Sequence, residues 1–422
     1  MHPLSFSLTP TLLILLTIPS SLTTDPKLLS IELKPNFGAY YAELSLGNPP
    51  QTIYHGLDQG LTVTWTDVFK YSPSKSSTHQ IIKQGDLKFQ HLHLYGNEVK
   101  DSMHFPNNQT LPNFTFYTIK DSRGYNSRVG GFGLAHKFTD YKYSLVHQLH
   151  NEGLITKRSF AFVPPSSTNN GMFYIGGIPS NETHNKLISK CKVAGSYANW
   201  ACKLSYIFMG DISYVYDNIY YHNDDYAFFQ SAESRILVPH KFIQYLETHT
   251  LKQHLESGDC IKELYGMNQR FQCNCKVKET FPKMSFVFDS VAYTLTNEDL
   301  FVVDHGDVCN LGMVSNHIRK NNWIFGTKLI GKFISEFDFD EKEVRFYYDK
   351  EQEDTVYFVD LDVIFPWRKL LRISKYVVGV VLLIVCVGFI GLKIKNRKRR
   401  KMKKIAKHVE DGVAEELKPQ EE

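Results

Sequence analysis

One apolar run near the C-terminus divides this chain into a large folded part and a short tail. Tyr376 to Leu392 form 17 consecutive positions without a charge, close to the minimum for a helix that crosses roughly 30 Å of hydrocarbon. Ten Lys and Arg residues follow between Lys393 and Lys407, and the positive-inside rule makes that end cytoplasmic. We therefore expect a juxtamembrane linker at 351–375, a transmembrane helix at 376–392 and a cytoplasmic tail, basic then acidic, at 393–422. A buried core helix is the alternative.

A second apolar stretch, Leu12 to Ile18, lies near the N-terminus and is followed by small residues. This pattern is typical of a secretory signal peptide at 1–23, although no Lys or Arg precedes the stretch. The two stretches together predict a single-pass type I membrane protein with an ectodomain of about 350 residues, Thr24 to Lys375. The ectodomain is then lumenal or extracellular, in the secretory pathway or at the cell surface.

Cysteines and glycosylation motifs agree with an oxidising compartment. Cys386 falls within the apolar run, which leaves six cysteines in the ectodomain, an even number suited to three disulfides. Sequons at Asn108, Asn113 and Asn181 predict N-glycosylation. Metal binding by these cysteines is the weaker alternative, because no CxxC pair is present. We expect no metal site and no cofactor.

Composition excludes several other classes of protein. The chain is 42% hydrophobic with 26 Gly and 17 Pro in 422 residues, which excludes disorder, collagen and a small disulfide scaffold. The net charge of +4 arises from the tail, because residues 393–422 carry +5 and the rest carries −1. A partner nucleic acid is therefore not expected.

Short segments rich in Tyr, Phe, Val and Ile dominate the ectodomain and alternate with period two. The predicted strands are Tyr40–Leu46, Leu61–Trp65, Phe114–Ile119, Ser159–Val163, Met172–Ile175, Met284–Phe288 and Val344–Tyr348. The best helical candidates are Tyr143–Glu152 and His240–His254, the second of which begins after Pro239. The pattern predicts a mostly β protein whose length requires two lobes.

The sequence contains an internal repeat. An apolar strand runs into a D/Q-x-G/A turn at Gly56–Gly60 and again at Phe228–Ala232. An apolar pair followed by Gly occurs at Phe132–Gly133 and again at Phe325–Gly326. Such doubling predicts two related lobes that face one another.

These motifs, in this order, resemble the pepsin-like aspartic proteases of eukaryotes over about residues 38–350. The matching segments are Tyr40–Gln51, Leu57–Gly60, Tyr71–Thr78, Gly130–Ala135, Asn151–Ile155, Phe173–Ile178 and Trp323–Asp338, and Trp65 follows Asp58 at the family spacing. The resemblance implies a bilobal β fold with a central cleft. It also implies an N-terminal segment at 24–37, an N-terminal lobe at 38–190 and a C-terminal lobe at 191–350.

Catalysis in this family needs two carboxylates about 3 Å apart that share one proton. One carboxylate activates a water and the other donates a proton to the peptide carbonyl. The resemblance assigns the first to Asp58, but the position of the second is Gln230. An amide neither takes up nor releases a proton near physiological pH. Half of the proton relay is therefore missing.

Other departures fall around the same turns. The family's Thr after the first Asp is Gln59, the hydroxyl residue three positions after that Asp is Leu61, and the Gly of the second turn is Ala232, whose Cβ crowds the backbone. Gly60 and Ser231 keep the family's residue types.

The flap that covers the cleft in this family also departs from the pattern. Phe89 stands where the family has a Tyr, with Tyr95 as the alternative in another register. His91 and His93 lie near the tip on one strand face, and we interpret them as exposed polar residues rather than metal ligands. The segment 24–37 is shorter and less basic than the cleft-filling segment of the family's zymogens, as expected of a protein with no activity to restrain.

The resemblance also suggests a disulfide pattern. Pro282 and a predicted strand follow Cys275 as they do in the family's C-terminal lobe, which implies the pair Cys275–Cys309. Cys191–Cys202 and Cys260–Cys273 are then the simplest remaining pairs, although sequence alone leaves the connectivity open.

Three functions remain to be distinguished. The first is a catalytically inactive pepsin-like protein that binds a peptide or protein in its cleft. The second is an active aspartic endopeptidase in which Glu233 replaces the missing acid beside Asp58. The third is a structural surface glycoprotein with a vestigial cleft.

Overall fold

The computed structural model describes residues 27–36, 38–89, 92–123, 130–137, 140–166, 170–180, 186–195, 199–210, 219–220, 225–265, 268–316, 322–347, 355–359 and 366–416. The predicted signal peptide, the sequon at Asn181 and the flap tip at residues 90–91 lie outside these ranges. By its contacts the chain divides into two units, residues 1–357 and 358–422.

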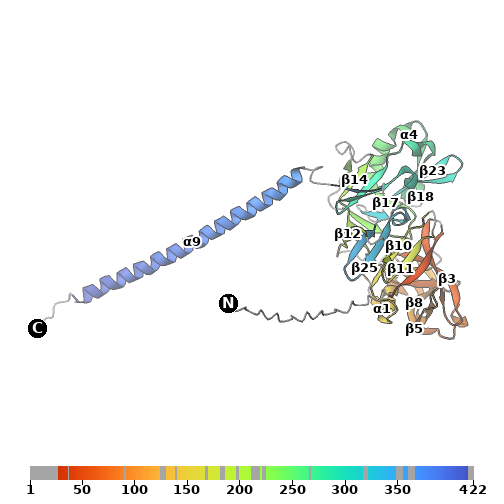
Figure 1. Cartoon of the computed structure of the whole chain (residues 1–422), viewed down its shortest axis with the longest axis horizontal. Helices are drawn as coiled ribbons and strands as arrows, with labels where there is room; N and C mark the ends of the chain where they lie inside the picture. The colour runs from red at the N-terminus through yellow and green to blue at the C-terminus, as the bar shows by residue number, and fades with distance from the viewer. Residues whose placement is uncertain are drawn as a thin grey trace, which may run out of the picture. The chain divides into compact units, whose positions relative to one another are not determined.

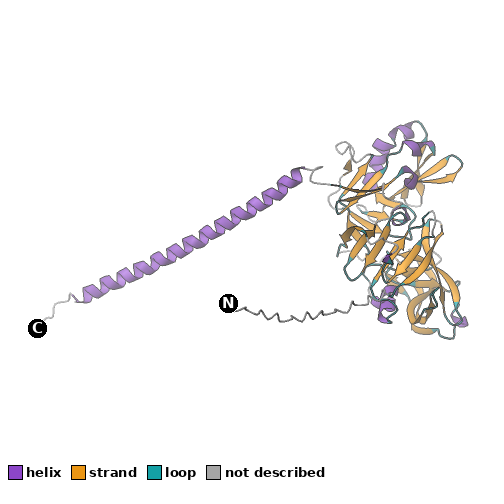
Figure 2. Ribbon diagram, viewed as in Figure 1, coloured by secondary structure: helices purple, strands orange, loops and turns teal. Residues whose placement is uncertain are grey.

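The first unit is built mainly from strands, with a few short helices (Figure 2). Its N-terminal half contains β1 Leu29–Asn36, β2 Ala39–Leu46, β3 Gln51–Asp58, β4 Trp65–Asp67, η1 Pro73–Lys75, β5 Gln80–Gln84, β6 Leu87–Phe89, β7 Leu92–His104, β8 Thr110–Arg123, β9 Gly131–Gly133, η2 Tyr141–Tyr143, α1 Leu145–Asn151, β10 Ser159–Val163 and β11 Met172–Ile175.

The rest of the described chain adds a second set of strands and short helices: β12 Leu187–Lys192, β13 Ala201–Lys203, β14 Tyr206–Met209, β15 Ile219–Tyr220, β16 Tyr226–Phe229, β17 Ile236–Pro239, α3 His240–Tyr245, η4 Leu246–Thr250, α4 Lys252–Glu256, β18 Cys260–Tyr265, β19 Asn268–Asn274, α5 Lys276–Thr280, β20 Met284–Phe288, β21 Val291–Leu295, α6 Asn297–Leu300, β22 Phe301–His305, β23 Val308–Asn316, β24 Trp323–Phe325, α7 Thr327–Ile330, β25 Ile334–Asp338, β26 Glu343–Tyr347 and β27 Val356–Phe358.

The internal repeat predicted from the sequence is confirmed by the strand topology. In the first half, β9 pairs in parallel with β3 and antiparallel with β4, and β4 pairs in parallel with β8. In the second half, β24 pairs in parallel with β16 and antiparallel with β17, and β17 pairs in parallel with β23. The same four-strand arrangement therefore occurs twice, and in each copy a D/Q-x-G/A turn follows the first strand.

A shared sheet joins the two halves. It is part of a 14-stranded sheet and contains the strands β12-β26-β25-β10-β11-β1 in that order, and Figure 1 shows β12, β25, β10 and β11 together in the middle of the first unit. Aromatic rings fill the core against this sheet: Phe160 stacks on Phe337 at 4.8 Å between ring centroids, and Trp200 meets Phe337 edge-on at 5.4 Å. Much of the segment predicted at 24–37 is strand β1, which pairs with both β11 and β2.

Most predicted strands are observed at or near their predicted residues, but the strand at Leu61–Trp65 is wrong. The observed strand β4 begins only at Trp65. Residues 61–64 bend because the amide of Leu61 donates to the carbonyl of Asp58 and because Gly133 passes so close that a Cβ there would lie 2.7 Å from the amide nitrogen of Val63. The predicted helix at His240–His254 is divided into α3, the π-helical segment η4 and α4.

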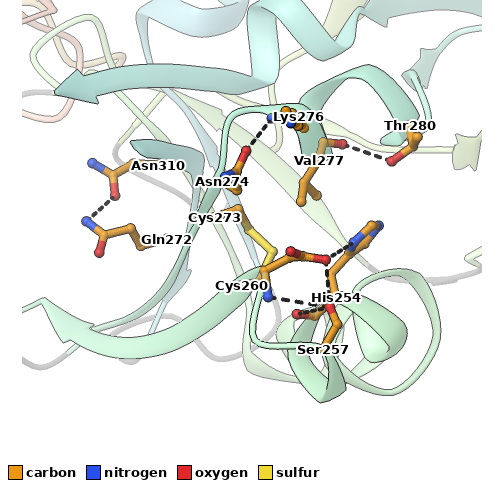
Figure 3. The surroundings of a disulfide bond; sticks show 11 residues. His254, Ser257, Cys260, Gln272, Cys273, Asn274, Lys276, Val277, Thr280 and Asn310 are labelled. Atoms are coloured by element: carbon orange, nitrogen blue, oxygen red, sulfur yellow. Dashed lines mark hydrogen bonds and ion pairs between the residues drawn. A yellow bond between two sulfur atoms is a disulfide. The ribbon is translucent and has the colours of Figure 1, made fainter. Parts of the chain in front are cut away.

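The three predicted disulfides, Cys275–Cys309, Cys191–Cys202 and Cys260–Cys273, are confirmed. Figure 3 shows Cys260–Cys273, which joins directly opposed positions of the antiparallel strands β18 and β19. Near it the side chain of Asn274 accepts from the amide of Lys276 at the start of α5. Three disulfide bonds are typical of a secretory or extracellular compartment.

The second unit contains the helix α9, Pro366–Glu416. Val377–Met402 within it is long and apolar enough to cross a membrane, with a mean hydropathy of 2.8 over its most apolar window. All but the first residue of the predicted span 376–392 lie within this segment, which continues past Leu392 to Met402.

Candidate active site

The first turn fixes Asp58 at the end of β3. Its backbone carbonyl accepts from the amides of Leu61 and Leu134, the latter at 3.0 Å, and its Oδ1 accepts from the amide of Gly60 at 2.7 Å. The residue is buried, with 1% of its surface exposed. Backbone pairing from two segments and a short local hydrogen bond therefore hold this carboxylate in one orientation.

The second turn follows β16 and shares a backbone hydrogen bond with the first. The amide of Gln230 donates to the carbonyl of Phe325 at 2.9 Å, and the amide of Glu233 donates to the carbonyl of Gln230 at 3.0 Å. The second of these bonds corresponds to the one from Leu61 to Asp58 in the first turn. Gln230 therefore occupies the position that matches Asp58 in the repeat.

A hydrogen-bonded link joins the two turns. Oε1 of Gln59 accepts from the amide of Ser231 at 2.6 Å and lies 2.8 Å from its hydroxyl, which also contacts the carbonyl of Leu57. Gln59 and Ser231 are both fully buried. The Gln that replaces the family's Thr thus still hydrogen-bonds across the lobes, and the Ser231 hydroxyl donates to one of two acceptors at a time.

The side chains of Asp58 and Gln230 converge beside Gly60. A Cβ added at Gly60 would lie 3.0 Å from Oδ1 of Asp58, 3.3 Å from Nε2 of Gln230 and 3.5 Å from Nδ2 of Asn199. One carboxylate and two amides therefore surround the same point. Asn199 lies in the segment before β13 and belongs to none of the motifs found in the sequence, so it was not predicted as a site residue.

This set of groups limits the chemistry available. The family's mechanism needs two groups that exchange a proton, and at this point only Asp58 is ionisable. The amides of Gln230 and Asn199 can donate or accept hydrogen bonds but cannot supply or remove a proton near physiological pH. The arrangement is suited to holding a polar group, such as a peptide carbonyl or a water, in place.

Two of the residues that differ from the family, Ala232 and Leu61, fit into the described structure. Ala232 does not have a positive φ, so its Cβ carries none of the expected backbone strain. Leu61 is buried in an apolar cluster with Val63, Trp65, Leu94, Tyr117 and Ile119. Leu61 therefore lacks the hydroxyl that the family has at this position. It belongs instead to an apolar cluster that includes Leu94 of strand β7.

Glu233, the suggested replacement acid, is engaged elsewhere. Its Oε1 accepts from the amide of Arg235 at 3.1 Å and from Nε of the same residue at 2.9 Å, and its Oε2 lies 3.4 Å from Nη2. The side chain is partly buried with this arginine. The structure therefore places the carboxylate of Glu233 in an ion pair on its own turn.

The flap is a hairpin of β6 and β7. Its register pairs Leu87 with Leu94 and Phe89 with Leu92, so Phe89 is the last paired position before the tip. The ring centroids of His93 and Tyr95 are 3.9 Å apart, and Nε2 of His93 lies 3.5 Å from Oδ2 of Asp86. Within the described residues no group of three or more His, Cys, Asp or Glu side chains is placed to hold a metal.

A hollow of about 580 Å³ opens beside the second turn. Its polar lining includes Ser234, Arg235, Arg270 and Lys328, and Leu311 contributes to its apolar walls. Burial lowers the pKa of Lys328, an effect that Asp299 opposes. The hollow thus combines apolar surface with cationic side chains, and neither Asp58 nor Gln230 is among the residues that line it.

Comparisons with known proteins agree with this geometry. The family model described as eukaryotic aspartyl protease matches residues 39–347. Human gastricsin is 21% identical over 332 residues, which cover 73% of this chain and 81% of gastricsin, and dog pepsin B is 20% identical over 340 residues, which cover 73% and 80%. The crystal structure of an aspartic proteinase from Irpex lacteus superimposes with a TM-score of 0.62 at 14% identity, over 78% of this chain and 99% of that one.

Proposed function

Because the chain belongs to the eukaryotic aspartyl protease family, we propose that it is a membrane-anchored, pepsin-like protein that binds a peptide or protein segment in its cleft without cleaving it. The observation that carries this proposal is the pair of amides beside Asp58. Gln230 takes the place of the second carboxylate, and Asn199 adds another neutral group at the same point. A site with one ionisable group lacks the shared proton on which this family's chemistry depends.

The ion pair of Glu233 argues against the alternative of an active endopeptidase. To replace the missing acid, Glu233 would have to leave three contacts with Arg235 and turn toward Asp58. Leaving a partly buried guanidinium without its carboxylate is unfavourable. The described geometry therefore supports binding rather than hydrolysis.

Three features support peptide binding over a purely structural role. The buried hydrogen bonds between Gln59 and Ser231 keep the two turns together. Asp58 is held in one orientation by the amide of Gly60. The hollow beside Ser234 and Arg235 offers apolar walls and cationic groups to side chains of an extended segment.

Membrane anchoring and glycosylation complete the proposal. Tyr376–Leu392 is the proposed span, within the apolar segment of α9, with the basic run that begins at Lys393 on its cytoplasmic side. Asn108 and Asn113 are exposed, as glycosylation requires. The ectodomain is proposed to lie in the lumen of the secretory pathway or outside the cell.

The test is a cleavage assay with the oxidised full chain in detergent micelles. A diverse peptide library is incubated from acid to neutral pH with the wild type, Asp58→Asn and Gln230→Asp, and the products are identified by mass spectrometry. We expect no cleavage by the wild type or by Asp58→Asn. Cleavage gained by Gln230→Asp would show that the cleft accepts peptides and lacked only the second acid.

Cleavage by the wild type that disappears in Asp58→Asn would contradict the proposal. It would mean that another acid completes the site. Folding of each variant is checked by its thermal unfolding temperature, so that a loss of activity is not confused with a loss of structure.

A further inference from the structure

A second hollow, of about 730 Å³, lies apart from the two turns. None of its lining residues belongs to residues 58–61 or 230–235. Its walls come from both halves of the first unit: the segment after β9, helices η2 and α1 and the loop before β10 on one side, and the segment after β12 and the β25–β26 turn on the other. A ligand in this hollow would therefore contact both halves.

Cationic side chains outnumber acidic ones in this hollow. Lys137, Arg158 and Lys342 line it, and Asp340 is the single carboxylate among its lining residues. Asp340 is already paired, because its Oδ1 lies 2.7 Å from Nε and 2.5 Å from Nη2 of Arg158. The charges of Lys137 and Lys342 are thus left without a carboxylate in the hollow.

The two lysines are held at fixed places in the fold. The ammonium of Lys137 donates to the carbonyl of Gly195 across the hollow. Lys342 lies in the β25–β26 turn with φ of 55°, and its carbonyl accepts from the amide of Val193 at 2.9 Å. Within the described part of the chain, Lys342 has no ion-pair partner. Both lysines are exposed, and two cations that line one hollow are suited to an anion that bridges them.

A buried histidine gives an independent reason to expect a ligand. His136 lines the hollow, is 6% exposed, and packs its ring against Trp200 at 4.9 Å. Its Nδ1 is buried without a hydrogen-bond partner among the described residues. Burial, with repulsion from Lys137 and Lys342, lowers the pKa of His136 to about 4, so the ring is neutral at neutral pH. Buried polar groups are rarely left unpaired in native proteins.

We propose that this hollow binds a phosphate group carried on a small organic molecule. Two separated lysines match a doubly charged oxyanion better than a single carboxylate, and the unpaired ring of His136 can hydrogen-bond an oxygen of the same group. The volume exceeds that of an inorganic ion, and the exposed Tyr141 and the buried Phe339 also line the hollow. This proposal is independent of the cleft and of its catalytic state.

The experiment is calorimetric titration of the oxidised full chain in detergent, at constant ionic strength, with glucose 6-phosphate, glucose and inorganic phosphate as probes. We expect glucose 6-phosphate to bind, glucose not to bind, and inorganic phosphate to bind more weakly. The double variant Lys137→Gln with Lys342→Gln is expected to bind glucose 6-phosphate about tenfold more weakly or worse, because it loses two charged hydrogen-bond donors.

The matched control is Lys252→Gln, which removes an exposed lysine of α4 outside the hollow and is expected to bind like the wild type. Lys342→Gln alone, at an exposed turn, serves if the double variant fails to fold, with an expected loss of about threefold or more. Equal affinity of the wild type and a folded Lys342→Gln variant would overturn the proposal, as would binding of glucose. If inorganic phosphate binds as tightly as glucose 6-phosphate, the proposal that the phosphate is carried on an organic molecule is wrong.

Discussion

At the scale of single residues, the two turns share a backbone hydrogen bond and differ in their capacity for proton exchange. Asp58 ends β3, Gln230 follows β16, and the carbonyl of each accepts from the amide of the residue three positions later. Their side chains meet beside Gly60. The repeat therefore preserves the frame of an aspartic protease site while the second ionisable group is absent.

Gln59 is predicted to stabilise this frame. Gln59→Leu removes the acceptor for the amide of Ser231 and leaves that buried N–H without its partner. We expect the free energy of unfolding to fall by about 1–3 kcal/mol, measured by urea denaturation. Gln253→Leu, at an exposed position of α4, is the control and should change stability by less than about 0.5 kcal/mol. An unchanged stability of Gln59→Leu would contradict the role given to this residue.

His55 is predicted to make the fold sensitive to acid. It is fully buried and stacks on Phe132 at 4.5 Å, and burial lowers its pKa from 6.5 to about 3. The unfolded chain therefore binds a proton that the native chain does not. The stability associated with the neutral ring is complete above about pH 6.5 and falls by about 1.4 kcal/mol per pH unit as the pH drops toward 3.

Comparing urea midpoints at neutral and mildly acid pH tests this prediction. In His55→Leu, the loss of stability on acidification should be smaller than in the wild type by about 2 kcal/mol at about pH 5. His249→Leu changes an exposed histidine and should keep the wild-type dependence. If His55→Leu and the wild type lose the same stability, the buried ring is not the cause.

At the scale of elements, the strands of the shared sheet carry a buried ionic network. The carboxylates of Glu336 and Asp338 on β25 are at most 2% exposed and lie 2.5 Å and 2.9 Å from Nζ of Lys157. Arg345 on β26 lies 2.6 Å from Asp338 and 3.4 Å from Glu336. Burial alone would raise the pKa of Asp338, but the amide of Glu341 and the charges of Lys157 and Arg345 together lower it.

Arg345→Met is predicted to destabilise the sheet strongly. It leaves two buried carboxylates with a single cation, and such a loss costs about 3–5 kcal/mol. Lys190→Met, on the neighbouring strand β12, removes an exposed lysine 3.2 Å from Glu343 and should cost less than about 1 kcal/mol. Urea denaturation at neutral pH compares the two variants. Similar losses in both would show that burial does not set the strength of this network.

Elements could be predicted from the sequence where alternation alone determines them. Ser159–Val163 and Met284–Phe288 are strands at the predicted residues, because apolar β-branched and aromatic residues there meet other strands on both edges. Leu61–Trp65 has the same local composition but bends, because Gly133 from a distant segment passes beside it. The hydrophobic periodicity of residues 61–65 does not reveal that a distant segment passes beside them.

The site was only partly predictable for a similar reason. Asp58 and Gln230 were placed by motif spacing. The contact of Gln59 with Ser231 joins residues 172 positions apart, and Asn199 reaches the site without any motif. Both depend on how the two halves pack, which local sequence does not specify.

At the scale of the whole molecule, a folded β unit is followed in the chain by the long helix α9. The uncharged run Tyr376–Leu392 of that helix is predicted to hold the chain in the bilayer. The full chain should remain in the membrane fraction after an alkaline carbonate wash, while a chain without residues 358–422 should be released into the soluble lumenal or extracellular fraction. Release of the full chain by the wash would contradict the anchor.

Whether the cleft holds a peptide without cleaving it can be tested by identifying the peptides that the protein retains. The oxidised full chain in detergent is incubated with a diverse peptide library and washed, and the bound peptides are identified by mass spectrometry for the wild type, Asp58→Ala, Phe89→Ala and the control Gln253→Leu. We predict intact peptides from the wild type and the control, and about tenfold fewer from the two cleft variants. Fragments cut at a common position, or equal recovery from all four proteins, would contradict the account.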